Sequence, residues 1–512
     1  MIRRVFSLLV TLTVLFMVLT ATALAVARLW IPAVSNYRVE IENRAADFLH
    51  AAVRIDNVEA AWRGLGPIIK LGGITVSDPD DGELLLEVDH IWLAVDMWRL
   101  ISKQEVLLAG VSVIGTSLDF VQDESGHLRL KNFSSTTPPE EVARWLLGQH
   151  RITLLQSTIN LYRGSEEDDP ARFSDVNITL QNSDTSHRVS GYVRLPEQLG
   201  MRLDFQADLR GSVDHVPWNG RVYVRAMSVS LGELSRQIGM YADLPFLFSG
   251  TMDTRLWFDI ADTRLQRVIA ELDVSGIRVH DADVSGSIAF DAERLGGLVA
   301  WRQKDSIRQL SIERLSIVRN GQTLREMDLS LAMQQLEDGS ESVTCIADHV
   351  NLRDASRLLL AMPMTGEGLR EQLAALQPEG ELDGVHVSFS KRDDRITGLS
   401  FQAKFHDFGN QAWKGMPGFS GLDGVMRGTA NQGAVEIYSR NVLIDEPGFF
   451  SEALHFDRIK GIVQWQRFAD SLRIGAAEIG LRADGLEARS RLILDVPDGA
   501  GEPYLDMQVR VD

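Results

Sequence analysis

From Val53 onward, hydrophobic and polar residues alternate with a period of two through most of the chain. The apolar positions fall at every second residue in segments around 202–212, 254–261 and 398–408: Leu203, Phe205 and Leu209; Leu256, Phe258 and Ile260; and Leu399, Phe401 and Phe405. Side chains of a β-strand point alternately to its two faces, so this spacing gives one apolar and one polar face. The pattern predicts a long series of antiparallel strands.

Glycine and turn-forming residues divide the alternating segments. We interpret Gly191, Gly211, Gly250, Gly286, Asn320-Gly321 and Gly461 as turns between strands. The acidic stretch from Asp78 to Glu83 lacks the residue spacing of a calcium-binding loop and is also predicted to be a turn.

Four segments have the period of a helix instead. They lie at 35–52, after Pro138-Pro139, at 231–242 and at 354–376. The first has an apolar stripe that includes Tyr37, Ile41 and Phe48. That stripe could lie on a membrane surface or cover the first part of the sheet, and its mixed polar face favours the second interpretation.

An uncharged stretch runs from Val5 to Ala27, directly after Arg3 and Arg4. Its 23 residues exceed the roughly 20 that a helix needs to cross a bilayer core. The basic residues before it favour a cytoplasmic N-terminus and an exported body. A cleaved signal peptide is the alternative, but its apolar core is usually shorter, so we favour an uncleaved anchor.

Composition narrows the function further. The chain has 512 residues and a formal net charge of −19, which disfavours nucleic acid as a partner. Its one cysteine, Cys345, lies in a strand-like segment and is interpreted as a small buried residue. No nucleotide-binding, nucleophile-elbow or zinc-protease motif is present, and the 11 histidines are scattered. We therefore predict no catalytic, cofactor-binding or metal-binding residues.

A sheet with one apolar face must cover that face. Two sheets can pack face to face, a barrel can close, or the sheet can curl into a groove that holds an apolar ligand. The alternation does not choose among these arrangements, and a sandwich is the commonest of them.

Several short motifs narrow this choice. The segments 53–78 and 88–120 resemble the opening part of the YhdP-type, AsmA-like proteins of Gram-negative envelopes. The residues that carry this resemblance are Trp62, Gly66-Pro67, Trp92, Asp96 and Trp98-Arg99. The segments 373–389, 416–428, 439–466 and 503–511 are similar to later parts of that family. Members of the family are typically longer, and the alternation is still running at Asp512, so the chain is either a short member or an N-terminal portion.

The resemblance implies a mainly β protein whose elongated antiparallel sheet curls into an apolar groove for phospholipid acyl chains. It implies no enzyme activity, no cofactor and no metal. The expected location is the inner membrane, crossed once, with the body in the periplasm; outer-membrane or other envelope proteins are the expected further partners. Leu203, Phe205, Leu209, Leu256, Phe258, Ile260, Leu399, Phe401 and Phe405 are the candidate groove lining, and core packing is the alternative for each of them.

On this interpretation the chain divides into five parts. They are a cytoplasmic stub and anchor (1–31), a juxtamembrane amphipathic helix (32–52), a first part of the groove (53–350), a helical insertion (351–378) and a continuation of the groove (379–512). An envelope scaffold with a β-sandwich body that binds proteins is the alternative function, and an exported hydrolase ranks last because no motif supports it.

Overall fold

The structure is a computed structural model. It describes residues 12–18, 21–22, 37–49, 51–63, 66–79, 82–95, 108–122, 128–131, 139–163, 169–212, 215–239, 246–281, 288–361, 365–392, 395–414, 416–446, 448, 451–498 and 502–511. The described residues form 25 strands and a few short helices, which confirms the prediction of a mainly β protein.

The chain divides into two compact units. The first comprises Met1–Ala226 with Ile260–Arg264, and the second comprises Met227–Asp259 with Leu265–Asp512. Each unit is described by itself below.

Elements up to β10 begin in the first unit. They are α2 (Arg38–Leu49), β1 (Ala52–Arg63), β2 (Gly66–Ser77), β3 (Leu84–Val95), β4 (Leu108–Gln122), β5 (Leu128–Leu130), α4 (Pro139–Gly148), β6 (Arg151–Arg163), β7 (Ala171–Asn182), β8 (Ser186–Arg194), β9 (Arg202–Ser212) and β10 (His215–Ser230).

The remaining elements follow in chain order. They are α5 (Leu231–Gly239), β11 (Phe246–Ala261), β12 (Arg264–Asp281), β13 (Ile288–Lys304), β14 (Ile307–Arg319), β15 (Gln322–Thr323), β16 (Met327–Gln335), β17 (Glu341–Asn351), α6 (Leu352–Ala361), α7 (Glu367–Leu376), β18 (Glu379–Arg392), β19 (Arg395–Asn410), β20 (Gly418–Thr429), β21 (Gln432–Asp445), β22 (Leu454–Arg467), β23 (Ser471–Ala483), β24 (Leu486–Pro497) and β25 (Tyr504–Val511).

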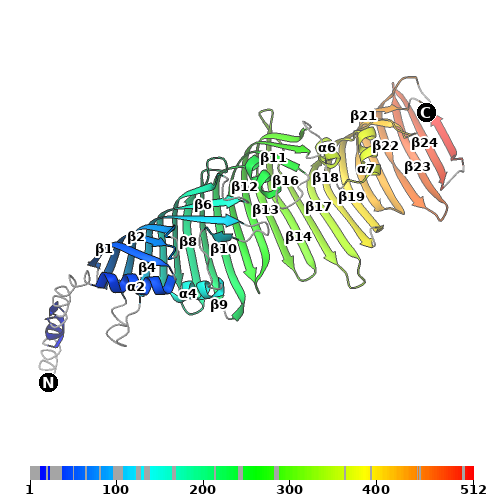
Figure 1. The fold of residues 1–512 in the computed structure, drawn as a ribbon. Helices are drawn as coiled ribbons and strands as arrows, with labels where there is room; N and C mark the ends of the chain where they lie inside the picture. The colour runs from blue at the N-terminus through cyan, green and yellow to red at the C-terminus, as the bar shows by residue number, and fades with distance from the viewer. Residues whose placement is uncertain are drawn as a thin grey trace. The chain divides into compact units, whose positions relative to one another are not determined.

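Strands that follow one another in sequence lie side by side and pair antiparallel, as Figure 1 shows for β16 to β19. One pair departs from the expected antiparallel pattern. Strands β4 and β6 run parallel, with Val113 beside Leu154, because β5 and the helix α4 lie between them in the chain. A parallel pair needs such a crossover connection.

The predicted helices are found at α2, α4, α5 and the pair α6 and α7. Ile41 of α2 packs against the buried cluster of Ile55, Val58, Leu71, Ile74 and Val88. This contact confirms that the helix covers the first part of the sheet. Figure 1 shows α6 and α7 near one end of β17 and β18, and α6 contacts both strands.

The predicted turns have a mixed outcome. Asn320 and Gly321 have φ of 53° and 71° and join β14 to β15, as expected of a two-residue hairpin. The ends of the predicted turn from Asp78 to Glu83 are joined by a 2.8 Å hydrogen bond from the Asp78 N–H to the Glu83 carbonyl, and residues 80–81 lie outside the described residues. Gly191, Gly211, Gly250 and Gly461 lie inside strands, so their interpretation as turns was wrong; Gly286 is outside the described residues.

A line of β-bulges crosses the strands of each unit. In the second unit the amide of Arg314 donates to Oδ1 of Asp328 at 2.7 Å, and the amide of Asp328 donates to Oδ1 of Asp348 at 2.7 Å. Farther along, the amide of Asp407 donates to Oδ1 of Asp423 at 3.1 Å, and that of Asp423 to the Ser439 hydroxyl at 2.7 Å. Each side chain supplies the acceptor that the ladder lacks where a strand carries an extra residue, and a bulge bends its strand.

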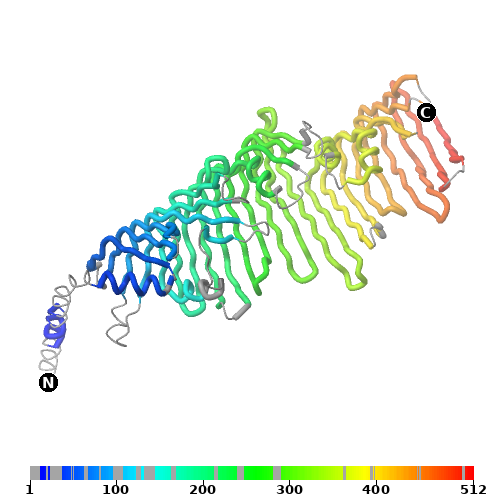
Figure 2. The backbone as a smooth tube through the Cα atoms, viewed as in Figure 1, coloured from blue at the N-terminus to red at the C-terminus, as the bar shows by residue number. Residues whose placement is uncertain are grey.

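The first unit has a similar line. It passes Gly73 of β2 and Gly115 of β4, which have φ of 61° and 66°, and reaches β6, where the Gln156 amide donates to Oδ1 of Asn177 at 3.3 Å. We call each of these two series a bulge line. In Figure 2 strand tubes change direction part-way along their length, most clearly in the green and yellow strands.

The buried core follows these lines. Ile55, Ile74 and Val88 flank the first bulge line and are at most 4% exposed. Phe405 and Val442 flank the second at 4% and 0% exposed. The rings of Phe405 and Phe408, on either side of Asp407, meet edge to face with centroids 6.1 Å apart. The strands therefore bend toward their apolar face.

Two expectations about the overall architecture are corrected. The strongly curled sheet is not seen: each unit has an open sheet that bends along its bulge line. Within each unit the described strands belong to a single hydrogen-bonded sheet, so the two packed sheets of a sandwich are not found among them. The bend localises at the bulges because regular pleated strands between them favour only a gentle twist.

The predicted anchor, Val5–Ala27, lies mostly outside the described residues; residues 12–18 and 21–22 within it are helical. In the part of the chain that the structure describes, no helix combines the length and apolarity needed to cross a membrane.

Candidate functional site

An unbroken row of apolar side chains and glycines crosses the second unit. Residues that pair across neighbouring strands share a face, so the register defines this row directly. It crosses 13 strands, with one residue from each: Val268, Trp301, Leu310, Leu331, Cys345, Val387, Phe401, Gly428, Gly433, Trp465, Ile474, Leu494 and Leu505. We call this the long apolar row.

The first unit has an equivalent row of eight residues. It consists of Val58, Leu71, Ile91, Val113, Leu154, Ile178, Gly191 and Phe205, from β1 to β9 without β5. Each unit therefore presents a continuous apolar face on the inside of its bend.

The opposite face is polar. A second row of paired residues runs across this face and includes Gln402, Arg427 and Gln464. Each of the three is next in sequence to a member of the long apolar row. This separation of polarity across one layer of strands is the feature that the alternation predicted.

The candidate residues on β9 lie on the apolar face of the first unit. Phe205 pairs with Gly191, and Leu203 pairs with Val193. Leu209 pairs with His187, a buried residue whose ring nitrogens lie 2.9 Å from Asn182 Oδ1 and 3.2 Å from the Gly211 carbonyl. The apolar face of β9 thus ends beside a buried polar residue.

The candidates on β19 share the apolar face of the second unit. Phe401 belongs to the long apolar row, Leu399 pairs with Phe389, and Phe405 lies at the bulge line. Phe401 and Leu399 are half-buried. Phe405 is therefore part of the core. For this candidate the alternative interpretation, core packing, is the one that the structure supports.

The candidates on β11 are half-buried and share a face by their spacing: Leu256, Phe258 and Ile260. Met252 lies four residues before Leu256 on the same strand and therefore on the same face. It packs against the buried cluster around Val274. Leu256 and Phe258 therefore belong to the apolar face of the second unit.

Large aromatic rings cover glycines on neighbouring strands. A Cβ built on Gly428 would lie 2.5 Å from Cζ2 of Trp465, and one on Gly433 would be closer still. The Trp465 indole N–H donates to the Thr429 carbonyl at 3.3 Å, and its ring is stacked on Phe401 with an interplanar angle of 3° and centroids 5.8 Å apart. The two rings make a flat apolar surface across four strands.

The same relation recurs elsewhere. A Cβ on Gly191 would lie 2.9 Å from the Phe205 ring, and a Cβ on Gly424 would meet the Phe405 ring. Sequence reasoning missed these pairs because the two members lie on different strands. A glycine in an alternating segment was the available signal, since a glycine inside a strand often marks a close approach of another part of the chain.

Cys345 occupies a place in the long apolar row between Leu331 and Val387. Burial raises the pKa of its thiol above the usual value, so the group stays neutral and apolar in character. Cys345 is half-buried, so the prediction of a buried residue is met only in part.

A chain of charged and imidazole groups lies beside the second bulge line. Asp383 Oδ1 accepts from Arg325 at 2.9 Å and lies 3.1 Å from Nδ1 of the buried His349. His406 lies 3.6 Å from both Asp383 and Asp423. The hydrogen bond from His349 and the charge of Arg325 hold the pKa of Asp383 below its usual range. Among the described residues no group of three or more side chains could hold a metal ion.

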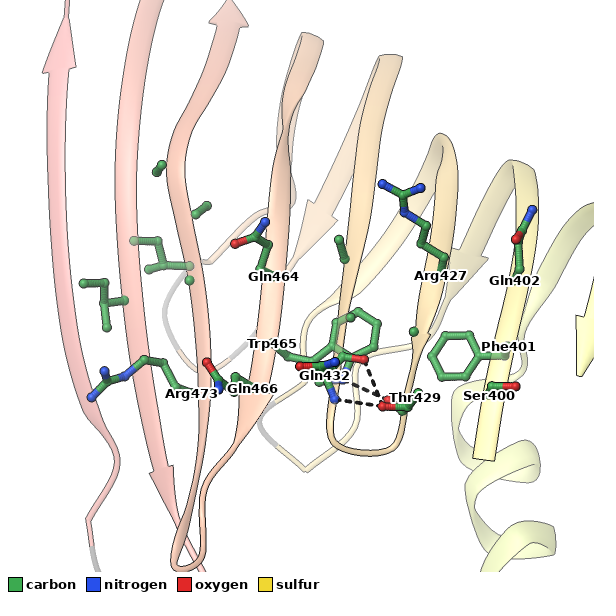
Figure 3. A pocket seen from close by; sticks show the side chains of 18 of the residues that line it. Ser400, Phe401, Gln402, Arg427, Thr429, Gln432, Gln464, Trp465, Gln466 and Arg473 are labelled. Atoms are coloured by element: carbon green, nitrogen blue, oxygen red, sulfur yellow. Dashed lines mark hydrogen bonds between the residues drawn. The ribbon is translucent and has the colours of Figure 1, made fainter. Parts of the chain in front are cut away.

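The polar face of the second unit is hollowed between β18 and β24. Figure 3 shows Gln402, Arg427 and Gln464, which lie on β19, β20 and β22, with Thr429 and Gln432 joined by hydrogen bonds at the lower edge of the hollow. The hollow has a volume of about 1030 Å³. A second hollow of about 870 Å³ lies between α6, α7 and the ends of β18 to β21, where Arg353 and Glu379 form an ion pair.

The family model described as YhdP protein matches residues 1–512. The chain belongs to the YhdP family. Among curated proteins it is similar to the "Intermembrane phospholipid transporter YhdP" of Escherichia coli (strain K12), with 21% identity over 516 aligned residues.

That alignment covers 95% of this chain and 38% of the relative. The chain therefore spans less than half the length of the curated relative that it matches. No solved structure matches it.

Proposed function

We propose that this protein moves phospholipid between the inner and outer membranes of a Gram-negative envelope without chemical catalysis. The observation that carries this proposal is the long apolar row, which crosses 13 strands on the inside of the bend. Membership of the YhdP family and the name of the relative support the same substrate.

Acyl chains would lie along the apolar faces while head groups remain in water at the open side. Burying each CH₂ contributes about 0.8 kcal/mol, so a chain of ordinary length is held well without any polar contact. The contact is non-directional, which lets a lipid slide along the row. No cofactor, metal or catalytic residue is needed for such movement.

The apolar faces have a floor and walls in this arrangement. Residues at the bulge lines, such as Phe405, are buried and form the floor of a groove. Phe401, Trp465 and Leu331 lie away from that line, are half-buried and form the wall that lipid contacts. Of the candidate lining residues, Leu203, Phe205, Leu209, Leu256, Phe258, Ile260, Leu399 and Phe401 belong to the wall.

The N-terminal segment would hold the groove at the inner membrane, with the body in the periplasm. The described helical residues 12–18 support this role, because Leu12, Leu15 and Phe16 are 55%, 54% and 71% exposed. Apolar side chains gathered in this way mark a surface that another apolar phase covers.

A photocrosslinking amino acid placed at neighbouring positions tests the proposal. With the probe at Phe401 we expect phospholipid adducts after irradiation in cells. With the probe at Gln402, one residue along β19 on the polar face, we expect few or none. Equal adduct yields at both positions, or none at Phe401, in a protein of normal abundance would refute lipid contact on this face.

A further inference from the structure

The polar hollow of the second unit has a composition unlike the rest of the chain. Residues of seven successive strands line it, and His386, Gln402, Arg427, Ala434 and Gln464 form one row of register partners across its floor. This row lies on the face opposite the long apolar row, since its members are next in sequence to members of that row. Four members of the long apolar row, Phe401, Gly428, Gly433 and Trp465, also border the hollow.

The charge of the lining is positive. Arg427, Arg473 and Arg491 line the hollow, and no aspartate or glutamate does, although the chain as a whole has a net charge of −19. Arg473 is held by Asp495 through hydrogen bonds of 2.7 and 3.0 Å. For Arg427 and Arg491, the residues that the structure describes supply no ion-pair partner. Two guanidinium groups therefore remain available to an anionic ligand.

The other polar groups of the hollow are neutral and both donate and accept. The side-chain amides of Gln402, Gln432, Gln464 and Gln466 come from three strands, β19, β21 and β22, which lie on both sides of the strand that carries Arg427. An amide carries two donor hydrogens and an acceptor oxygen, which suits the hydroxyl groups of a sugar. A volume of about 1030 Å³ is at the upper end for a small-molecule site and is far more than a single ion needs.

We propose that this hollow binds an anionic oligosaccharide. Its acidic groups would pair with Arg427 and Arg491, where the planar guanidinium fits a carboxylate or phosphate through two parallel hydrogen bonds. Its hydroxyls would bond to the glutamine amides. The head group of a lipid whose acyl chains lie on the apolar row cannot reach these residues through the sheet, so the site is separate from the proposed lipid path.

Calorimetric titration of the full chain in detergent tests this site. A trimer of galacturonic acid is the anionic probe, and maltotriose is the neutral probe of the same length. We expect the acidic trimer to bind, with affinity that falls as salt is raised, and maltotriose to bind at least tenfold more weakly. Arg427→Glu and Arg491→Gln should each weaken binding of the trimer at least tenfold.

Arg458→Glu is the matched control, because Arg458 is an exposed arginine of β22 that does not line the hollow. It should leave the affinity within twofold. Equal loss in Arg458→Glu and Arg427→Glu would reduce the effect to net charge and overturn the proposal, as would equal binding of inorganic phosphate and the trimer, or no binding of the trimer. Lipid adducts with the probe at Leu331, a member of the long apolar row that does not line the hollow, should be unchanged in Arg427→Glu, so failure of this site and failure of the lipid path are distinguishable.

Discussion

The indole of Trp465 covers Gly433 on the next strand so closely that no Cβ fits between them. Gly428, one strand farther, is covered by the same ring, which then stacks on Phe401. The flat aromatic surface on the apolar face thus depends on two residues that have no side chain.

Gly433→Ala should displace this indole. The added methyl group meets a rigid ring that is tied to the Thr429 carbonyl, so the neighbour cannot move freely. Overpacking of this kind costs about 1–3 kcal/mol of unfolding free energy. Equilibrium unfolding in urea measures the loss.

Gly398→Ala is the control for this substitution. Gly398 lies in β19, and a Cβ added there meets nothing within 4 Å. Its unfolding free energy should stay within about 0.5 kcal/mol of the parent value. If both variants lose the same stability, the effect comes from the alanine and not from contact with Trp465.

The bulge line of the second unit gives a second prediction. Oδ1 of Asp328 accepts the Arg314 amide at 2.7 Å, so Asp328→Ala leaves that amide without its acceptor. We expect a loss of about 1–3 kcal/mol, and we expect Asp328→Asn to retain most of the stability because its amide oxygen still accepts. Urea unfolding checks both.

Asp445→Ala serves as the matched variant for this pair. Asp445 is an exposed aspartate at the C-terminal end of β21, outside the bulge line. A loss of stability in Asp445→Ala as large as in Asp328→Ala would show that the bulge acceptor has no special role.

The strands and their faces could be predicted from the sequence because alternation reports directly on the side of a strand to which a residue points. Leu399, Phe401 and Phe405 illustrate this: all three lie on the apolar face. The bulge between Phe405 and Phe408 was not predicted, since one extra residue in an alternating segment looks like the end of a strand. Asp407, a polar residue between two phenylalanines, was the signal.

Glycines were the other source of error. Gly191 looks like a turn when its own segment is considered alone. In the structure it lies inside a strand and leaves room for the ring of Phe205, its partner on the next strand. Such a pair becomes visible only when the register is known. The parallel pairing of β4 and β6 was missed for a related reason: the helix α4 was predicted, but its consequence for strand direction was not.

A charge within the long apolar row should impede lipid. Leu331 pairs with Leu310 and Cys345 in this row, and a carboxylate placed there would have to lose water before an acyl chain could cover it. Leu331→Asp, combined with the probe at Phe401, should lower the yield of phospholipid adducts at least fivefold.

Ala332→Asp is the control for that experiment, because Ala332 is the next residue of β16 and faces the polar side. It should leave the adduct yield nearly unchanged. Circular dichroism of both variants separates a blocked path from a misfolded sheet. An unchanged yield in a folded Leu331→Asp variant would argue against movement of lipid along the row.

The groups around Asp383 should make stability depend on pH in the acid range. The hydrogen bond from His349, with the charges of Arg325 and His406, lowers the pKa of the Asp383 carboxyl in the folded protein. The unfolded chain, with an ordinary aspartate pKa of about 3.9, therefore binds a proton first as the pH falls. The contribution of Asp383 is fully present above about pH 4 and is lost as the pH falls through the lowered folded value.

We expect Asp383→Asn to be less stable than the parent at pH 6, and the difference to narrow toward pH 2.5. Urea unfolding across this range measures it, with Asp445→Asn as the exposed control. Parallel curves for the parent and Asp383→Asn would mean that the carboxylate contributes no pH-dependent stability.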